Sequence, residues 1–232
     1  MALKIRCKED SLVEIGVDEA GRGSFWGPIM AGAVILPSEW TDEQRTVFLQ
    51  LRDSKKIAPK KRALLSKKLK EIVPHYGIGI VTAEEINKHG ITWANKEAFH
   101  RAIQESIQKT VEPMGTRILI DGVLGLDSWE GEQELIIEGD NQYIAIAAAS
   151  ILAKVAHDEW IHAYCNEHPE CNERYDLLKS NGYGTAKHRE GIHLYGGHEL
   201  HRIVYIANWL PGASHIGKKR GKKEDKCLIQ FT

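Results

Sequence analysis

Five short apolar runs, bounded by glycine, proline or acidic residues, recur along the chain and are typical of buried β-strands. They span residues 13–17, 29–36, 76–81, 117–120 and 134–138. Only Gly21, Arg22 and Gly23 with the dipeptide Gly27-Pro28 punctuate the gap between the first two runs. Such a gap suits a sharp reversal, so these two strands are predicted to be antiparallel neighbours.

Amphipathic stretches between these runs predict helices. Thr41 with Gln44, and Thr82 with Glu85, have the spacing of capping boxes that begin helices. Pro59 suits the first turn of another helix, which carries Leu65, Leu69 and Ile72 on one face. A longer helix is predicted to begin at Thr92, with Phe99, Ile103 and Ile107 recurring every four residues. Asp140-Asn141 is predicted to cap a helix that runs to about Tyr164.

The resulting order, β-β-α-α-β-α-α-β-β-α, favours an α/β fold with a mixed five-stranded sheet flanked by helices. Residues 1–164 are expected to form this unit. Residues 165–212 form a small helical C-terminal extension, in which 165–182 is predicted to be an irregular insertion and 183–210 a helical end. Residues 213–232 are expected to be a flexible basic tail, with the run GKKRGKKEDK at 217–226.

Composition narrows the function classes only a little. The 232 residues carry a net charge of −1, so any grip on nucleic acid must come from local basic clusters. The first residues lack an apolar signal-peptide core, and no run has the 18 apolar residues of a membrane span. The four cysteines include no Cys-x-x-Cys pair. We therefore expect a protein of a reducing compartment, cytoplasmic or, in a eukaryotic or viral source, nuclear, without a membrane partner.

Four carboxylates stand at the ends of apolar elements. Asp18 and Glu19 directly follow the first strand, Asp121 follows the fourth, and Asp140 lies between the fifth strand and a helix. Each has an ordinary explanation taken alone: a solvated strand end, a turn at Asp121-Gly122, or a helix cap at Asp140. We favour one shared site over the hypothesis that all four carboxylates have these ordinary roles.

Such a cluster has a chemical use. Mg²⁺ and Mn²⁺ prefer oxygen ligands. Two such ions can activate a water and stabilise the leaving oxygen of a phosphodiester. Four carboxylates without cations would repel one another and raise their own pKa values. The pattern therefore predicts a site for two divalent ions, Mg²⁺ or Mn²⁺, and hydrolysis of a phosphodiester.

Five blocks of sequence, in order, resemble the type 2 ribonucleases H (ribonuclease HII and its relatives). They are GVDEAGRG at 16–23, DSKK at 53–56, LIDG at 119–122, GD at 139–140 with AAASILAKV at 147–155, and GYGT at 182–185 with His188. They are spread in order across residues 13–188, about three quarters of the chain. Five blocks in the same order are far more specific than any one of them.

The resemblance implies a ribonuclease H-like fold and an endonuclease that hydrolyses the RNA strand of RNA–DNA hybrids. It also implies nicking at single ribonucleotides in duplex DNA, by two metal ions, leaving 5′-phosphate and 3′-hydroxyl ends. The catalytic metal ligands would be Asp18, Glu19, Asp121 and Asp140. The substrate contacts would be Gly21, Arg22, Gly23, Lys55, Lys56, Lys154, Tyr183 and His188. Glycines let the backbone approach the 2′-hydroxyl, which distinguishes RNA from DNA.

The chain departs from the family pattern at three places. Trp26 is bulkier than the small residues usual after the glycine-arginine-glycine turn, so it either packs into the core or alters the pocket at the RNA–DNA junction. Residues 165–182 are longer than the usual connection, and Asn181 replaces a frequent lysine. These differences bear on recognition of the ribose more than on the metal site.

Other features leave alternatives open. The basic stretch from Lys55 to Lys70 is either a solvated helix face or a phosphate contact, and we favour contact for Lys55 and Lys56. A zinc site at His188, His193, His198 and His201 is disfavoured because no cysteine accompanies them. The basic tail suits a phosphate-binding arm or a nuclear address, and residues 227–232 (CLIQFT) only weakly suggest a sliding-clamp peptide.

Three functional hypotheses follow. The leading one is a monomeric two-metal endonuclease acting on hybrids, in replication and in ribonucleotide excision repair. The second is the sister type, ribonuclease HIII, which requires longer RNA tracts and typically carries an extra N-terminal domain. The third is a hybrid-binding accessory without turnover, against which the four intact acids argue.

Overall fold

The computed structural model describes residues 3–108, 115–127 and 129–213. Its five strands are β1 (Val13–Ala20), β2 (Ile29–Ile35), β3 (His75–Val81), β4 (Thr116–Asp121) and β5 (Glu132–Ile136). Its first helices are α1 (Asp42–Phe48), α2 (Pro59–Ile72), α3 (Ala83–His89), α4 (Ile91–Gln108) and α5 (Ile144–Glu167). The C-terminal helices are α6 (Pro169–Tyr175), α7 (Leu177–Ser180), α8 (Ala186–Tyr195) and α9 (Ile203–Ile206). Three short 3-10 turns are η1 (Ser54–Lys56), η2 (Gly139–Asn141) and η3 (Ala207–Trp209).

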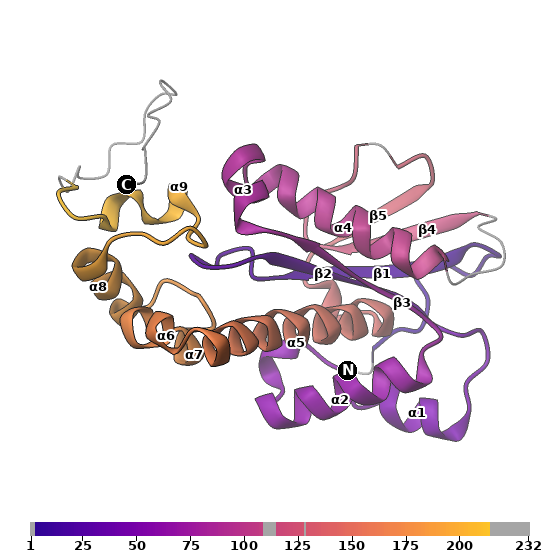
Figure 1. Ribbon diagram of the computed structural model, residues 1–232. Helices are drawn as coiled ribbons and strands as arrows, with labels where there is room; N and C mark the ends of the chain where they lie inside the picture. The colour runs from indigo at the N-terminus through magenta and orange to yellow at the C-terminus, as the bar shows by residue number, and fades with distance from the viewer. Residues whose placement is uncertain (1–2, 109–114, 128, 214–232) are drawn as a thin grey trace.

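The strands form one mixed sheet in the order β3-β2-β1-β4-β5. β1 pairs antiparallel with β2 and parallel with β4, so the predicted reversal between the first two strands is confirmed. α3 and α4 cover one face of the sheet, whereas α5, with α1 and α2 outside it, covers the other (Figure 1). The predicted mixed five-stranded sheet between helices is therefore confirmed.

Glycines let the helices approach the sheet closely. A Cβ on Gly16 or Gly32 would lie 2.3 Å from the main chain of α5, at Ala145 and Ala149. On the other face, a Cβ on Gly79 would collide with the carbonyl oxygen of Ala98 in α4. The alanine-rich sequence of α5 suits this contact, because small side chains leave room for the backbone of the strands.

Helix beginnings follow the predicted caps in three cases. Both capping boxes are present, with the Thr41 and Thr82 side chains accepting from the amides of Gln44 and Glu85. Pro59 occupies the first turn of α2. The cap predicted at Asp140-Asn141 is wrong, because these residues form the 3-10 turn η2 and α5 begins only at Ile144.

Two strands have boundaries that differ from the prediction by two residues or more. β1 continues through Asp18 and Glu19 to Ala20, because these residues still pair with β2. β5 spans Glu132–Ile136, two residues earlier than predicted, since its partners on β4 end at Asp121. The acids of the first strand therefore belong to the strand itself and have a rigid base.

Residues 165–182 are helical and not an irregular insertion. The end of α5 together with α6 and α7 covers most of this segment, and Cys171, Tyr175 and Leu177 are buried. They pack around Trp26, which is 0% exposed, with Ile161 of α5 and Ile192 of α8. Of the two alternatives for Trp26, packing into the core is thus confirmed. In Figure 1 the C-terminal helices lie together at one end of the sheet.

Within the described residues, no helix combines the length and the apolar character needed to span a membrane. The basic run at 217–226 and the residues 227–232 lie outside the described part of the chain.

Candidate active site

The four predicted metal ligands lie at the ends of neighbouring elements. Val17 of β1 is paired with Ile120 of β4, so the residues that follow them, Asp18 and Asp121, lie side by side on parallel strands. Asp140 lies in η2, whose Gly139 amide donates to Asp121 Oδ1 at 2.6 Å. Three separate segments thus bring carboxylates to one edge of the sheet.

Burial and neighbouring negative charge raise the pKa values of Asp18, Glu19 and Asp140. Burial, and then the charges of Glu19 and Asp121, raise the pKa of Asp18 well above its usual range. Burial also raises the pKa of Glu19. Burial and the charge of Asp121 raise the pKa of Asp140 to about 6. The cluster is therefore strained electrostatically unless positive charge is present.

The donor set suits hard divalent cations, because it consists of carboxylate oxygens that are partly withdrawn from water. Among the described residues, no three histidine, cysteine, aspartate or glutamate side chains converge closely enough to hold one metal ion. The acids thus share one electrostatic site, and their side chains would need to adjust to ligate a common ion. The assignment of Asp18, Glu19, Asp121 and Asp140 as ligands of Mg²⁺ or Mn²⁺ stays a prediction.

A cleft of about 460 Å³ adjoins Asp18 and Glu19. Most of the predicted substrate contacts line it: Gly21, Arg22, Gly23, Lys55, Lys154 and Tyr183. Ser54 and Ser150 lie on its wall, with the Ser150 hydroxyl donating to Ser54 Oγ at 3.0 Å. The glycine loop, the 3-10 turn η1, helix α5 and the C-terminal extension therefore meet in one cavity next to the acids.

Tyr183 is held on one side of this cleft by α5. The Lys154 ammonium lies 5.3 Å from the centre of the Tyr183 ring and also pairs with Asp158 Oδ1 at 2.8 Å. Ser24 in the glycine loop forms an isolated antiparallel bridge with Tyr183. The tyrosine motif therefore packs directly against the loop that contains Gly21 to Gly23.

Two predicted contacts lie elsewhere. Lys56 turns toward η2, where its ammonium donates to Asn141 Oδ1 at 2.8 Å and lies 3.5 Å from Asp53. His188 is 0% exposed. A buried ring has no surface for a phosphate, so the predicted direct substrate contact at His188 is corrected to an interior position.

Asn95 of α4 is a further residue near the acids, and it was not predicted from the sequence. Its side chain is 0% exposed, and neither amide atom has a hydrogen-bond partner in the described part of the chain. It lies close enough to Glu19 to lower the pKa of that carboxyl, against the larger effect of burial. A polar residue at a position of α4 that otherwise faces the core, next to Ala94 and Ala98, was the available signal.

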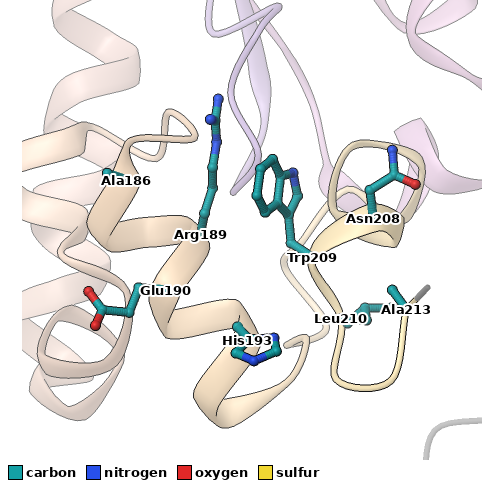
Figure 2. Close-up of a pocket in the computed structure, with 8 residues that line it drawn as sticks. All are labelled: Ala186, Arg189, Glu190, His193, Asn208, Trp209, Leu210 and Ala213. Carbon is teal, nitrogen blue, oxygen red and sulfur yellow. The ribbon is translucent and has the colours of Figure 1, made fainter. Parts of the chain in front are cut away.

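A second cavity, of about 420 Å³, lies in the C-terminal extension between α8 and η3 (Figure 2). Arg189 and Trp209 stand side by side there, with the guanidinium carbon 4.7 Å from the ring centre. Its lining includes neither the acids nor the glycine loop.

A mixed sheet with carboxylates at the ends of two adjacent parallel strands, covered by helices on both faces, is the arrangement of the ribonuclease H-like fold class. The family model for ribonuclease HII matches residues 15–208. The chain therefore belongs to the ribonuclease HII family, and it is a ribonuclease H, an endonuclease that cleaves RNA in RNA–DNA hybrids.

Known relatives agree with this assignment. A ribonuclease HII of Prochlorococcus marinus is 41% identical over 192 residues, which are 83% of this chain and 95% of the relative. The crystal structure of the ribonuclease H2 from Pyrococcus horikoshii OT3 is similar with a TM-score of 0.66 at 25% identity, over 85% of this chain and 97% of that one. A structure of Bst-RNase HIII in complex with Mn²⁺ shares the fold, with a TM-score of 0.62 at 21% identity, over 86% of this chain and 69% of that one.

Proposed function

We propose that this ribonuclease H nicks duplex DNA at single embedded ribonucleotides as well as cutting longer hybrids. The observation that carries the proposal is the junction of three features: buried acids, a glycine loop and Tyr183 around one cleft of about 460 Å³. A site that touches one ribose on both sides needs no run of ribonucleotides. This separates the proposal from the sister type, which requires longer RNA tracts.

Asp18, Glu19, Asp121 and Asp140 would hold two divalent ions, Mg²⁺ or Mn²⁺. When bound, these ions supply an activated water and stabilise the leaving oxygen, which gives 5′-phosphate and 3′-hydroxyl ends. The protein's own residues position the substrate. Gly21 to Gly23 offer backbone amides to the 2′-hydroxyl and its phosphate, and Tyr183 contacts the sugar. Lys55, Lys56 and Lys154 place positive charge near the duplex backbone.

We further propose residues 1–164 as the catalytic domain and 165–212 as an extension that delivers Tyr183 to it. The protein would act as a monomer in the cytoplasm, in DNA replication and ribonucleotide excision repair. One similar solved structure is that of the "PCNA:RNase HII complex from Archaeoglobus fulgidus", and residues 227–232 of this chain would be the segment for such a sliding-clamp contact.

The test is to replace Asp18 or Asp121 by asparagine. Each change removes one charge and preserves the shape of the side chain, so cleavage of a duplex with one ribonucleotide in Mg²⁺ should fall by about 10³-fold or more. Binding of the same duplex in Ca²⁺, measured by fluorescence anisotropy, should survive. Asp127→Asn, which changes an exposed acid paired with Lys96, is the matched control and should retain full activity. Full activity in either site variant would refute the proposal.

A further inference from the structure

The segment just before α9 contains a buried arginine whose side chain donates hydrogen bonds to four main-chain oxygens. Arg202 is 1% exposed. Its guanidinium donates to the carbonyls of Gly21 at 2.7 Å, Arg22 at 2.9 Å, Gly27 at 3.1 Å and Pro28 at 2.9 Å. Its own amide donates to the carbonyl of Phe25 at 2.8 Å. One residue, distant in sequence, thus ties together both ends and the middle of the loop between β1 and β2.

These bonds determine which way the loop's amides point. In a trans peptide the carbonyl of one residue and the N–H of the next point in opposite directions. Because the Gly21 and Arg22 carbonyls point to Arg202, the amides of Arg22 and Gly23 point away from the buried guanidinium. The hydrogen bonds of the described residues include none donated by these two amides. They remain available to a ligand in the cleft that this loop lines.

His201, the residue before Arg202, is connected to Tyr183 by hydrogen bonds through His188. The His198 amide donates to His201 Nδ1 at 2.8 Å, so that nitrogen carries no proton. The proton of His201 therefore lies on Nε2 and is donated to His188 Nε2 at 3.0 Å. His188 in turn carries its proton on Nδ1 and donates it to the main-chain carbonyl of Tyr183 at 3.0 Å.

Burial keeps both rings of this chain of hydrogen bonds neutral. It lowers the pKa of His201 to about 2 and that of His188 to about 4. Neutral rings satisfy the single direction of donation that the geometry requires. Three of the four histidines that were weighed as zinc ligands, His188, His198 and His201, thus form hydrogen bonds that end at the tyrosine motif.

Helix α3 in turn holds the main chain around His201 and Arg202. Asn87 of α3 donates to the His201 carbonyl at 2.9 Å and accepts from the Ile203 amide at 2.8 Å. The Tyr205 hydroxyl adds one more bond, to the carbonyl of Arg22 at 3.1 Å. His201 and Arg202 are therefore fixed themselves, while Arg202 fixes the glycine loop and His201 fixes Tyr183 through His188.

We infer that His201 and Arg202 are positioning residues for ribose recognition, with Arg202 setting the loop Gly21–Gly23 and His201 setting Tyr183 through His188. This inference rests on the proposed function, in which those two parts read one ribose. It assigns selectivity to residues that touch no substrate.

The experiment compares binding to two duplexes in Ca²⁺, one all DNA and one with a single ribonucleotide. The ratio of their dissociation constants measures selectivity. Arg202→Lys keeps the charge but loses the fork of donors, so the ratio should fall by about tenfold or more. His201→Leu should lower it similarly. Arg117→Lys is the matched control: Arg117 is also 1% exposed but pairs with Asp10, Glu14 and Glu132, so thermal stability should fall while the ratio stays within about twofold.

A purely structural role would lower thermal stability and leave selectivity unchanged, and that result would overturn the inference. Tyr205→Phe removes a single hydroxyl from a half-buried side chain, so it tests the inference even if Arg202→Lys does not fold. The Tyr205 hydroxyl and Arg202 donate to the same Arg22 carbonyl, so the variant should lower the ratio by about threefold. An unchanged ratio would mean that the orientation of this carbonyl does not affect selectivity, which contradicts the proposal. A wild-type protein without preference for the ribonucleotide would instead refute the proposed function.

Discussion

The acidic residues of the site are largely buried, and their negative charge lowers the stability of the folded protein when no metal is bound. Asp140 is 7% exposed, and its carboxyl is more easily protonated than in an unfolded chain. Such a group stabilises the folded state only while it is neutral. Residues that would hold cations are therefore expected to destabilise the protein when no cation is bound.

This cost predicts a pH-dependent gain in stability for Asp140→Asn. The pKa of Asp140 rises from 3.8 to about 6 on folding. Its stabilising contribution is complete below the unfolded value of 3.8 and is lost as the pH rises through about 6. In EDTA at pH 7.5, the uncharged variant should therefore be more stable than wild type, on the order of 2 kcal/mol.

Urea denaturation at pH 7.5 and at pH 3.5 measures this effect, and the difference should vanish at the lower pH. Glu138→Gln removes an exposed negative charge two residues away and should change little at either pH. Lower stability of Asp140→Asn at pH 7.5 would show that the charged carboxylate is favourably held without metal.

At the scale of the elements, apolar periodicity predicts the sheet and its flanking helices well, because each strand needs a buried face. It fails for residues 165–182. There the helices are short, and Asp176 and Asn181 take left-handed backbone conformations (φ 53° and 47°) without a glycine to signal them. A cap is predicted at Asp140 because acidic residues are common before helices. The intervening 3-10 turn has no distinct sequence signal.

Close packing of helix on strand predicts a large effect for Gly32→Ala. The new Cβ would lie 2.3 Å from the Ala149 carbonyl oxygen in the middle of α5, and neither backbone can move freely. The free energy of unfolding should fall by about 2–4 kcal/mol.

Chemical denaturation followed by circular dichroism checks this value. Gly125→Ala is the control, because the three atoms nearest to its Cβ would all be side-chain atoms, Gln133 Oε1 at 3.2 Å and the Leu135 methyl carbons at 3.6 and 3.8 Å. A cost below about 1 kcal/mol for Gly32→Ala would mean that α5 is not pressed against β2 as the structure shows.

Over the whole molecule, the chain order separates parts that the fold joins. Acids from residues 18 to 140, the glycine loop and a tyrosine at 183 meet in and around one cleft. Sequence blocks identify most of these residues, since each block carries its own short motif. They do not reveal Arg202 or Asn95, whose importance depends on partners more than 70 residues away along the chain.

The cleft is proposed to direct divalent-ion hydrolysis to a single ribose. The decisive measurement is cleavage of an end-labelled DNA duplex with one embedded ribonucleotide, in Mg²⁺ and in Mn²⁺, beside a duplex with a run of several ribonucleotides. We expect one nick at the ribonucleotide, with a 5′-phosphate and a 3′-hydroxyl, and no cut in the all-DNA duplex. Cleavage of the longer tract alone, or equal cleavage of the all-DNA duplex, would contradict this proposal.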